Sequence, residues 1–160
     1  DLGVMSSEPT GAQVETEPLF SVPLLLAASV DDPITRAPSV PLSRLSGLPL
    51  VIATLPNGGR VLLEERAREH GVELNVVLEV NSIHLIKRMV ARDGLYTIVS
   101  PPSVRAEIAA GELSAARIVR PQIVQHFHLA LGGRRRSGAA VRAVADLVRK
   151  LARGDRAARG

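Results

Sequence analysis

The chain has 160 residues, of which 46% are hydrophobic and 22% are charged, a balance typical of a globular protein and not of a disordered one. It contains no cysteine, which excludes disulfides, thiolate metal ligands and cysteine nucleophiles. Aromatic residues make up only 2%, so modules that stack nucleic-acid bases on aromatic rings are not expected. The longest apolar run, 22–30, falls far short of the ~20 residues that a membrane span needs.

Positive charge is concentrated near the C-terminus. The formal net charge is +4, and residues 134–160 hold nine arginines and lysines against two aspartates, which leaves +7 in this tail and therefore −3 in the rest. Such a tail can attract nucleic acid or an anionic surface without specificity, but a solvated helix face is the interpretation that we favour. Because the chain begins at Asp1, without a methionine or a recognisable leader, we expect a fragment of a longer protein or a processed product.

Short apolar runs alternate with segments of helical period along the chain. The first pattern predicts strands at 2–5, 14–19, 22–28, 50–54, 72–80, 96–99, 116–119 and 123–131, with turn residues separating the second from the third. The second pattern predicts helical segments at 41–45, 60–70, 103–110 and 139–153, and a further helix with the apolar stripe Ile83, Ile86, Met89 and Val90. In the last helix, one side carries Val141, Val144, Leu147, Val148 and Leu151.

The order of these elements predicts an α/β protein with two lobes. Strands and helices alternate over 50–119, which is typical of βαβ units and a mainly parallel sheet. The flanking segments hold few helices of their own, so we expect 1–38 and 122–160 to form one lobe and 39–121 to form a second lobe inserted into it. The chain then crosses between the lobes twice, and a cleft between α/β lobes is a preferred position for a ligand.

An ordered series of segments resembles the LysR-type transcriptional regulators. The series comprises DLGVM at 1–5, EPLFSVPLLLAASVDDP at 17–33, the segments 40–82 and 85–104, and EIAAGELSAARIV at 107–119. Within that family the pattern is most similar to regulators related to nitrogen-assimilation control. The resemblance rests on the order and spacing of the series, which covers nearly the whole chain, because no single motif in it is specific.

The resemblance implies the effector-binding domain of such a regulator. It implies a two-lobed fold like that of type 2 periplasmic binding proteins, with two hinge crossovers. It also implies that a small-molecule effector, which can be an anion, binds in the cleft. It also implies a cytoplasmic homo-oligomer that acts on DNA, with no membrane partner and no cofactor. The family's winged helix-turn-helix, its linker helix and the first elements of its first lobe have no counterpart here. We therefore expect an N-terminally truncated chain with an incomplete first lobe, which would contact DNA only through the missing domain.

The turn from Thr54 to Arg60 is the leading candidate for ligand binding. It joins the end of a buried strand to the start of a helix, where free backbone N–H groups and the helix dipole favour an anion. Gly58 and Gly59 allow a ligand to approach the backbone closely. The resemblance adds that Pro56, Asn57 and Gly58 match effector-contacting positions of the family.

Further polar residues follow other strand ends. Asn81 and Ser82 start the next helix at the same edge of the sheet, although helix capping is the interpretation that we favour for both. Ser100 follows the next strand, and Ser6 and Ser7 follow the first one. The predicted ligand-binding set is Thr54, Pro56, Asn57, Gly58, Ser82, Ser100 and Ser6.

The sequence predicts neither catalysis nor a metal site. It contains no nucleophile elbow, P-loop, dinucleotide-binding glycine motif or zinc-protease motif. His126 and His128 share one face of a strand, but no third ligand lies near them in sequence. The segments 60–70 and 72–80 resemble the surface that the family uses for dimerisation. Two alternatives stay open, a periplasmic solute-binding protein of the same fold and a non-functional truncated remnant.

Overall fold

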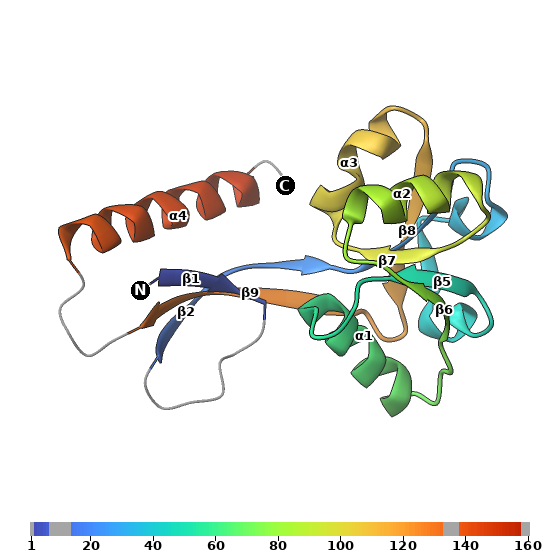
Figure 1. The fold of residues 1–160 in the computed structure, drawn as a ribbon, viewed down its shortest axis with the longest axis horizontal. Coiled ribbons are helices and arrows are strands. Elements are labelled where there is room, and N and C mark those ends of the chain that lie inside the picture. The colour runs from blue at the N-terminus through green and yellow to red at the C-terminus, as the bar shows by residue number, and fades with distance from the viewer. Residues whose placement is uncertain (1, 7–13, 133–137, 158–160) are drawn as a thin grey trace. The chain divides into compact units, whose positions relative to one another are not determined.

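A computed structural model describes residues 2–6, 14–132 and 138–157 of the chain (Figure 1). The chain divides into two compact units. The first unit combines Asp1–Ser21 with His126–Gly160, and the second unit is Val22–Gln125. The chain passes from one unit to the other twice, within strands β2 (Val14–Pro23) and β9 (Val124–Gly132). The order of segments is the one expected, since one unit is built from both ends of the chain and the other is inserted.

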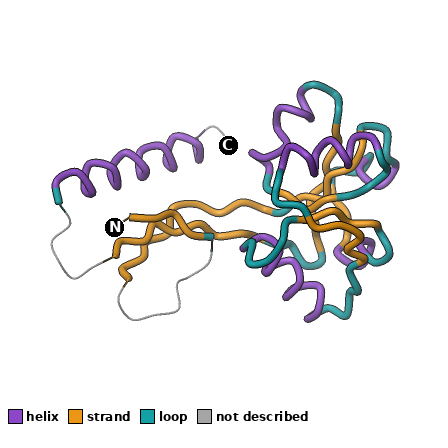
Figure 2. Tube along the Cα trace, viewed as in Figure 1, coloured by secondary structure: helices purple, strands orange, loops and turns teal. Residues whose placement is uncertain are grey.

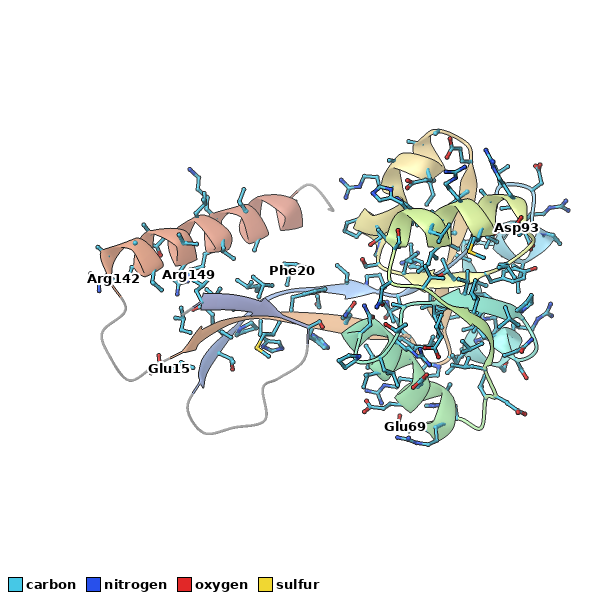
Figure 3. All side chains as sticks on the ribbon, viewed as in Figure 1. Glu15, Phe20, Glu69, Asp93, Arg142 and Arg149 are labelled. Atoms are coloured by element: carbon cyan, nitrogen blue, oxygen red, sulfur yellow. The ribbon has the colours of Figure 1, made fainter. Side chains whose placement is uncertain are left out.

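The first unit is a three-stranded sheet with one long helix. Its strand order is β1-β9-β2, and β1 (Leu2–Met5) runs antiparallel to β9. Helix α4 (Ala139–Ala157) packs on this sheet through Ala145 and Ala152, which contact Leu19 and Leu129. Arg149 lies on this helix (Figure 3). Its guanidinium ties the helix to β2 by two hydrogen bonds to Glu17, of 2.6 and 3.0 Å.

The packing face of α4 differs from the one that its sequence predicts. Val144, Leu147 and Leu151 remain exposed, whereas Ala145 and Ala152 are buried. Each alanine directly follows a residue of the predicted stripe, and their spacing of seven keeps them on one side of a helix. The two alanines are the buried helix residues of this core, and Val148 of the predicted stripe packs against it while partly buried.

The second unit contains a mixed sheet that the helices cover on both faces. Its strands are β3 (Leu25–Ser29), β4 (Ser39–Pro41), β5 (Pro49–Ile52), β6 (Asn75–Glu79), β7 (Thr97–Val99) and β8 (Leu113–Val119). Four pair in the order β4-β8-β3-β7, and β5 pairs with β6. Tyr96 joins the two groups, because Val51 N–H donates to its carbonyl at 2.9 Å and its own N–H donates to Pro49 at 3.0 Å.

Strand β3 adds one antiparallel strand to the predicted sheet and changes the predicted boundaries. It lies between β8 and β7 and runs antiparallel to both. Strand β4 runs parallel to β8, and β5 runs parallel to β6 and to Tyr96, so the strands within 50–119 run in one direction, as expected. Leu26, Ala27 and Ala28 are completely buried in it. Residues 22–38 and 122–125 therefore group with the second unit instead of the first. The reason is that this short apolar strand is buried in the interior of the second unit's sheet.

Two apolar cores lie on opposite faces of this sheet. Helix α1 (Gly58–Glu69) and the short 3-10 helix η2 (Leu42–Leu45) cover one face, and α2 (Ile83–Arg92) and α3 (Pro101–Ala109) cover the other (Figure 1). Leu26 points into the first core and Ala27 into the second, as alternation along a strand requires. A second 3-10 helix, η1 (Pro33–Thr35), follows β3.

Several element boundaries differ from prediction. Residues 14–23 form one strand without the expected break (Figure 2). Strand β6 covers only residues 75–79 of the expected 72–80, and its pairing with β5 shifts register between Leu50 and Val51. Helix α3 begins two residues early at Pro101, a position where proline's fixed φ suits the first turn. No helix among the described residues is long and apolar enough to cross a membrane.

Candidate functional site

The candidate site lies at one edge of the second unit's sheet. Strand β5 pairs in parallel with β6 on one side and with Tyr96, just before β7, on the other. The carboxyl ends of these three strands therefore meet at the same edge. Strand β5 leads into α1, β6 into α2 and β7 into α3, so three helices begin where these strands end.

The turn between β5 and α1 leaves two backbone donors free. Asn57 caps the helix, because its Oδ1 accepts a hydrogen bond from Arg60 N–H at 3.1 Å. Asn57 N–H donates in turn to the carbonyl of Thr54 at 3.2 Å. Within the described part of the chain, no acceptor pairs with the N–H of Gly58 or Gly59. These donors and the positive end of the helix dipole form an environment suited to an anion.

Asn81 fastens the end of β6 to the end of β5. Its Oδ1 accepts hydrogen bonds from both the N–H and the hydroxyl of Thr54. Ser82 instead caps α2, since its Oγ accepts from Leu85 N–H at 3.4 Å. The capping interpretation is therefore confirmed for Ser82 but not for Asn81, whose amide fixes the orientation of Thr54.

Arg60 holds three segments of this edge together, and the sequence analysis did not identify it. Its guanidinium donates to the carbonyl of Ala53 at 3.0 Å and forms ion pairs of 2.8 Å with Glu64 and Glu79. The hydrogen bonds that Arg60 donates to Glu79 and then to Glu64 raise the pKa of Arg60 above its already high value, and the same bond to Glu79 lowers the pKa of that carboxyl. The spacing of Arg60 and Glu64 is a helical i,i+4 pair, but only the pairing of β5 with β6 brings Glu79 to them.

Gln125 is a second residue that the sequence analysis missed. It lies at the start of β9, and only 8% of its surface is exposed. A Cβ placed on Gly59 would lie 3.6 Å from both Nε2 and Oε1 of this side chain. Sequence separation hides this neighbour of the α1 N-terminus, since the two residues meet only in the folded second unit.

The predicted ligand residues divide between the two units. Thr54, Pro56, Asn57, Gly58, Ser82 and Ser100 all follow β5, β6 or β7 in the second unit. Ser100 precedes α3, and its hydroxyl lies 3.1 Å from that of Ser103. Ser6 follows β1 in the first unit, and Ser7 lies outside the described residues. The structure thus brings six of the seven predicted residues to one sheet edge, and their contact with a ligand stays a prediction.

The arrangement offers hydrogen-bond donors and not a catalytic centre. No group of three histidine, aspartate or glutamate side chains able to hold a metal ion occurs within residues 2–6, 14–132 and 138–157. The donors at the α1 N-terminus can hold an anionic group, and the neighbouring hydroxyl and amide groups can orient it. In an α/β unit of this topology, the edge where parallel strands end is a usual position for binding a small molecule.

Comparison with known proteins identifies the family. The profile of the LysR substrate binding domain matches residues 1–153. The chain belongs to this family, which makes it a binding domain of transcriptional regulators and not an enzyme. It is 31% identical over 114 residues to a RuBisCO operon transcriptional regulator of Acidithiobacillus ferrooxidans, covering 71% of this chain and 37% of that protein. It is 25% identical over 129 residues to the transcriptional activator CmpR of Synechocystis, covering 81% and 42% respectively. The chain spans about two fifths of the length of these relatives.

Solved structures confirm the fold. The regulatory domain of CcmR from Synechocystis, in complex with 2-PG, is similar with a TM-score of 0.84 at 21% identity, covering 95% of this chain and 73% of that one. The effector-binding domain of QuiR, in complex with shikimate, gives a TM-score of 0.81 at 18% identity, covering 96% and 72%. The predicted α/β fold, like that of type 2 periplasmic binding proteins, is therefore the one that this chain adopts.

Proposed function

We propose that this chain senses a small anionic metabolite for a transcriptional regulator, and that the metabolite binds at the edge where β5, β6 and β7 end. The observation that carries this proposal is the pair of free N–H groups on Gly58 and Gly59, at the start of a capped helix. The bonds from Thr54 to Asn81 add a fixed polar group beside them. Pro56, Ser82, Ser100 and Ser6 remain predicted contacts of the same ligand.

The solved neighbours support this class of ligand. One contains 2-PG and another contains shikimate, which is a carboxylate. Anions of this size match what a helix N-terminus with two free donors can hold. Both neighbours are less than 25% identical to this chain, so the proposal rests on the hydrogen-bond donors of this chain. The neighbours supply only the first compounds to test.

The wider role follows from the relatives and is also a proposal. A chain that spans two fifths of its relatives needs a DNA-binding segment elsewhere in its protein to act on transcription, and would act in the cytoplasm as a homo-oligomer. Full-length CbnR, a structural neighbour with a TM-score of 0.75, has been solved with its target DNA. We further propose a target among assimilation genes, because a probable nitrogen assimilation activator of Synechococcus elongatus is 29% identical over 124 residues.

Substitution of Gly59 by alanine tests the proposed site. A Cβ there would lie 3.3 Å from Asn57 Oδ1, a close contact that requires Asn57 to shift by a few tenths of an ångström. The residue is helical, so alanine suits its backbone, and a thermal melt of the variant measures what the shift of Asn57 does to stability. We expect affinity for 2-PG or shikimate, measured by isothermal titration on the full natural protein, to fall by roughly tenfold, which is about 1.4 kcal/mol of binding free energy.

Gly138→Ala is the matched control, because a Cβ at this exposed glycine meets nothing within 4 Å. It should bind as the unaltered protein does. Unchanged affinity in Gly59→Ala, or an equal loss in both variants, would contradict the proposed position. A failure of the unaltered protein to bind either anion would count against an anionic effector of this class.

A further inference from the structure

Gln125 is a buried amide without a partner. Only 8% of the surface of Gln125 is exposed. None of the side-chain hydrogen bonds in the described part of the chain involves its amide. Buried amides normally satisfy their two donors and their acceptor oxygen. Among the described residues, the fully enclosed side-chain polar atom that lacks a partner is Oε2 of Glu107. The amide of Gln125 must therefore keep a narrow opening to solvent.

This amide lies at the free N-terminus of α1. Both its Nε2 and its Oε1 would be 3.6 Å from a Cβ on Gly59. Because glycine has no Cβ, no side chain at this position separates the amide from the N–H groups of the helix. Among the described side-chain hydrogen bonds, Asn57 pairs with Arg60 N–H and not with the Gln125 amide. Two independent features thus meet here, a helix start with unpaired donors and a buried polar side chain with nothing to bind.

The chemistry of an amide narrows the class of ligand. Nε2 donates and Oε1 accepts, whereas the N–H groups of Gly58 and Gly59 only donate. An anionic group can accept from the backbone donors and from Nε2, but it cannot satisfy Oε1. A hydroxyl next to that anionic group can donate to Oε1, so a hydroxy-acid satisfies every group that this corner offers.

We propose that Gln125 is a specificity-determining residue of the effector site, and that it selects small carboxylate or phosphate anions with a neighbouring hydroxyl. This inference rests on the proposed function, since it requires the anion to lie at the α1 N-terminus. It adds a contact from β9 to the predicted set and a reason why the site should prefer hydroxy-acids to simple acids.

The test compares one pair of probes and a third, larger probe on the full natural protein. Isothermal titration with glycolate and acetate, which differ by one hydroxyl, gives the preference for the hydroxy-acid, and shikimate serves as a larger probe. In Gln125→Leu, we expect glycolate and shikimate to bind roughly tenfold or more weakly, because the bond from Nε2 to the anion and the bond from the ligand hydroxyl to Oε1 are both lost. Acetate has no hydroxyl and should lose only the first bond, so its affinity should fall less and the preference for glycolate should disappear.

Gln122→Leu is the control, because Gln122 is an exposed glutamine three residues upstream and should keep the preference. A variant that merely fails to fold would lose all three probes and its cooperative thermal transition, so Gln125→Asn serves as a second variant that keeps an amide and should keep part of the preference. An unchanged preference in Gln125→Leu, or an equal loss for glycolate and acetate in folded protein, would overturn the inference while the proposed site stands. If the unaltered protein binds none of the three, the inference and the proposed site both fail.

Discussion

Tyr96 connects the two halves of the second unit's sheet with both its backbone and its side chain. Its backbone pairs with β5, and its hydroxyl donates a 2.8 Å hydrogen bond to Asp32 after β3. Burial, followed by the hydrogen bond to Asp32, raises the pKa of Tyr96 to about 12. The chain contains one tyrosine and no tryptophan, so ultraviolet absorbance follows the ionisation of this residue alone.

This pKa predicts a loss of stability at high pH. An unfolded tyrosine loses its proton near pH 10, whereas the folded one keeps it until about pH 12. Between these values the unfolded chain binds fewer protons, so the free energy of unfolding falls as pH rises, by at most about 1.4 kcal/mol per unit. Urea unfolding of the unaltered chain and of Tyr96→Phe at pH 8 and pH 11 measures this. The variant should lose less stability over that range, and equal losses would show that Tyr96 is not the group responsible.

Local capping was predictable at the candidate site, but long-range partners were not. Asn57 and Ser82 precede helical segments, and side-chain acceptors at such positions cap helices. The partners of Arg60 and Gln125 come from other strands, and no periodicity in the sequence specifies which distant residue will lie beside them. The position of the turn was thus predictable, whereas the groups that hold and surround it required the fold.

Strand β6 lies at the edge of the second unit's sheet and exposes two apolar side chains. It pairs only with β5 among the described strands, and Val77 and Leu78 are 48% and 39% exposed. An edge strand with exposed apolar side chains is a natural surface for pairing with another chain. We therefore expect this strand, with α1, to contribute to the proposed homo-oligomer, as the sequence resemblance implied.

Val77→Lys tests this surface. A charge on an exposed edge opposes pairing between copies, so sedimentation velocity on the full natural protein should show a smaller share of oligomer at the same concentration. Ile108→Lys on α3, where the side chain is 42% exposed, adds the same charge outside β6 and α1 and should leave the distribution unchanged. Because residue 77 is exposed, the thermal transition should move little. An unaltered oligomer in Val77→Lys would exclude this strand from the interface.

The register of β6 shows where pattern alone misleads. Apolar residues alternate from Val72 to Val80 and predict a nine-residue strand with one apolar face. The shift between Leu50 and Val51 interrupts this alternation, so Val77 and Leu78, neighbours in sequence, are both exposed. Helix α4 differs from its prediction for a related reason, since the partner's surface decides which side chains pack. The existence and the order of the elements were predictable from the sequence, but the faces through which they pack were less predictable.

At the scale of the whole chain, the discontinuous organisation was predictable and its boundaries were not. The number of helices in each segment correctly indicated that 1–38 and 122–160 were not self-sufficient. It could not show that β3, near the first boundary, would pair between β8 and β7. Strand pairing between distant segments decides such membership, and it leaves little trace in the local sequence.

The central claim is that a small anion binds at the N-terminus of α1. Amide NMR spectra of the full natural protein, titrated with 2-PG and with shikimate, test it most directly because each backbone N–H reports its own environment. The account predicts saturable shifts that are largest at Gly58, Gly59 and Thr54. Saturable binding with the largest shifts elsewhere, or no saturable shift with either anion, would contradict it.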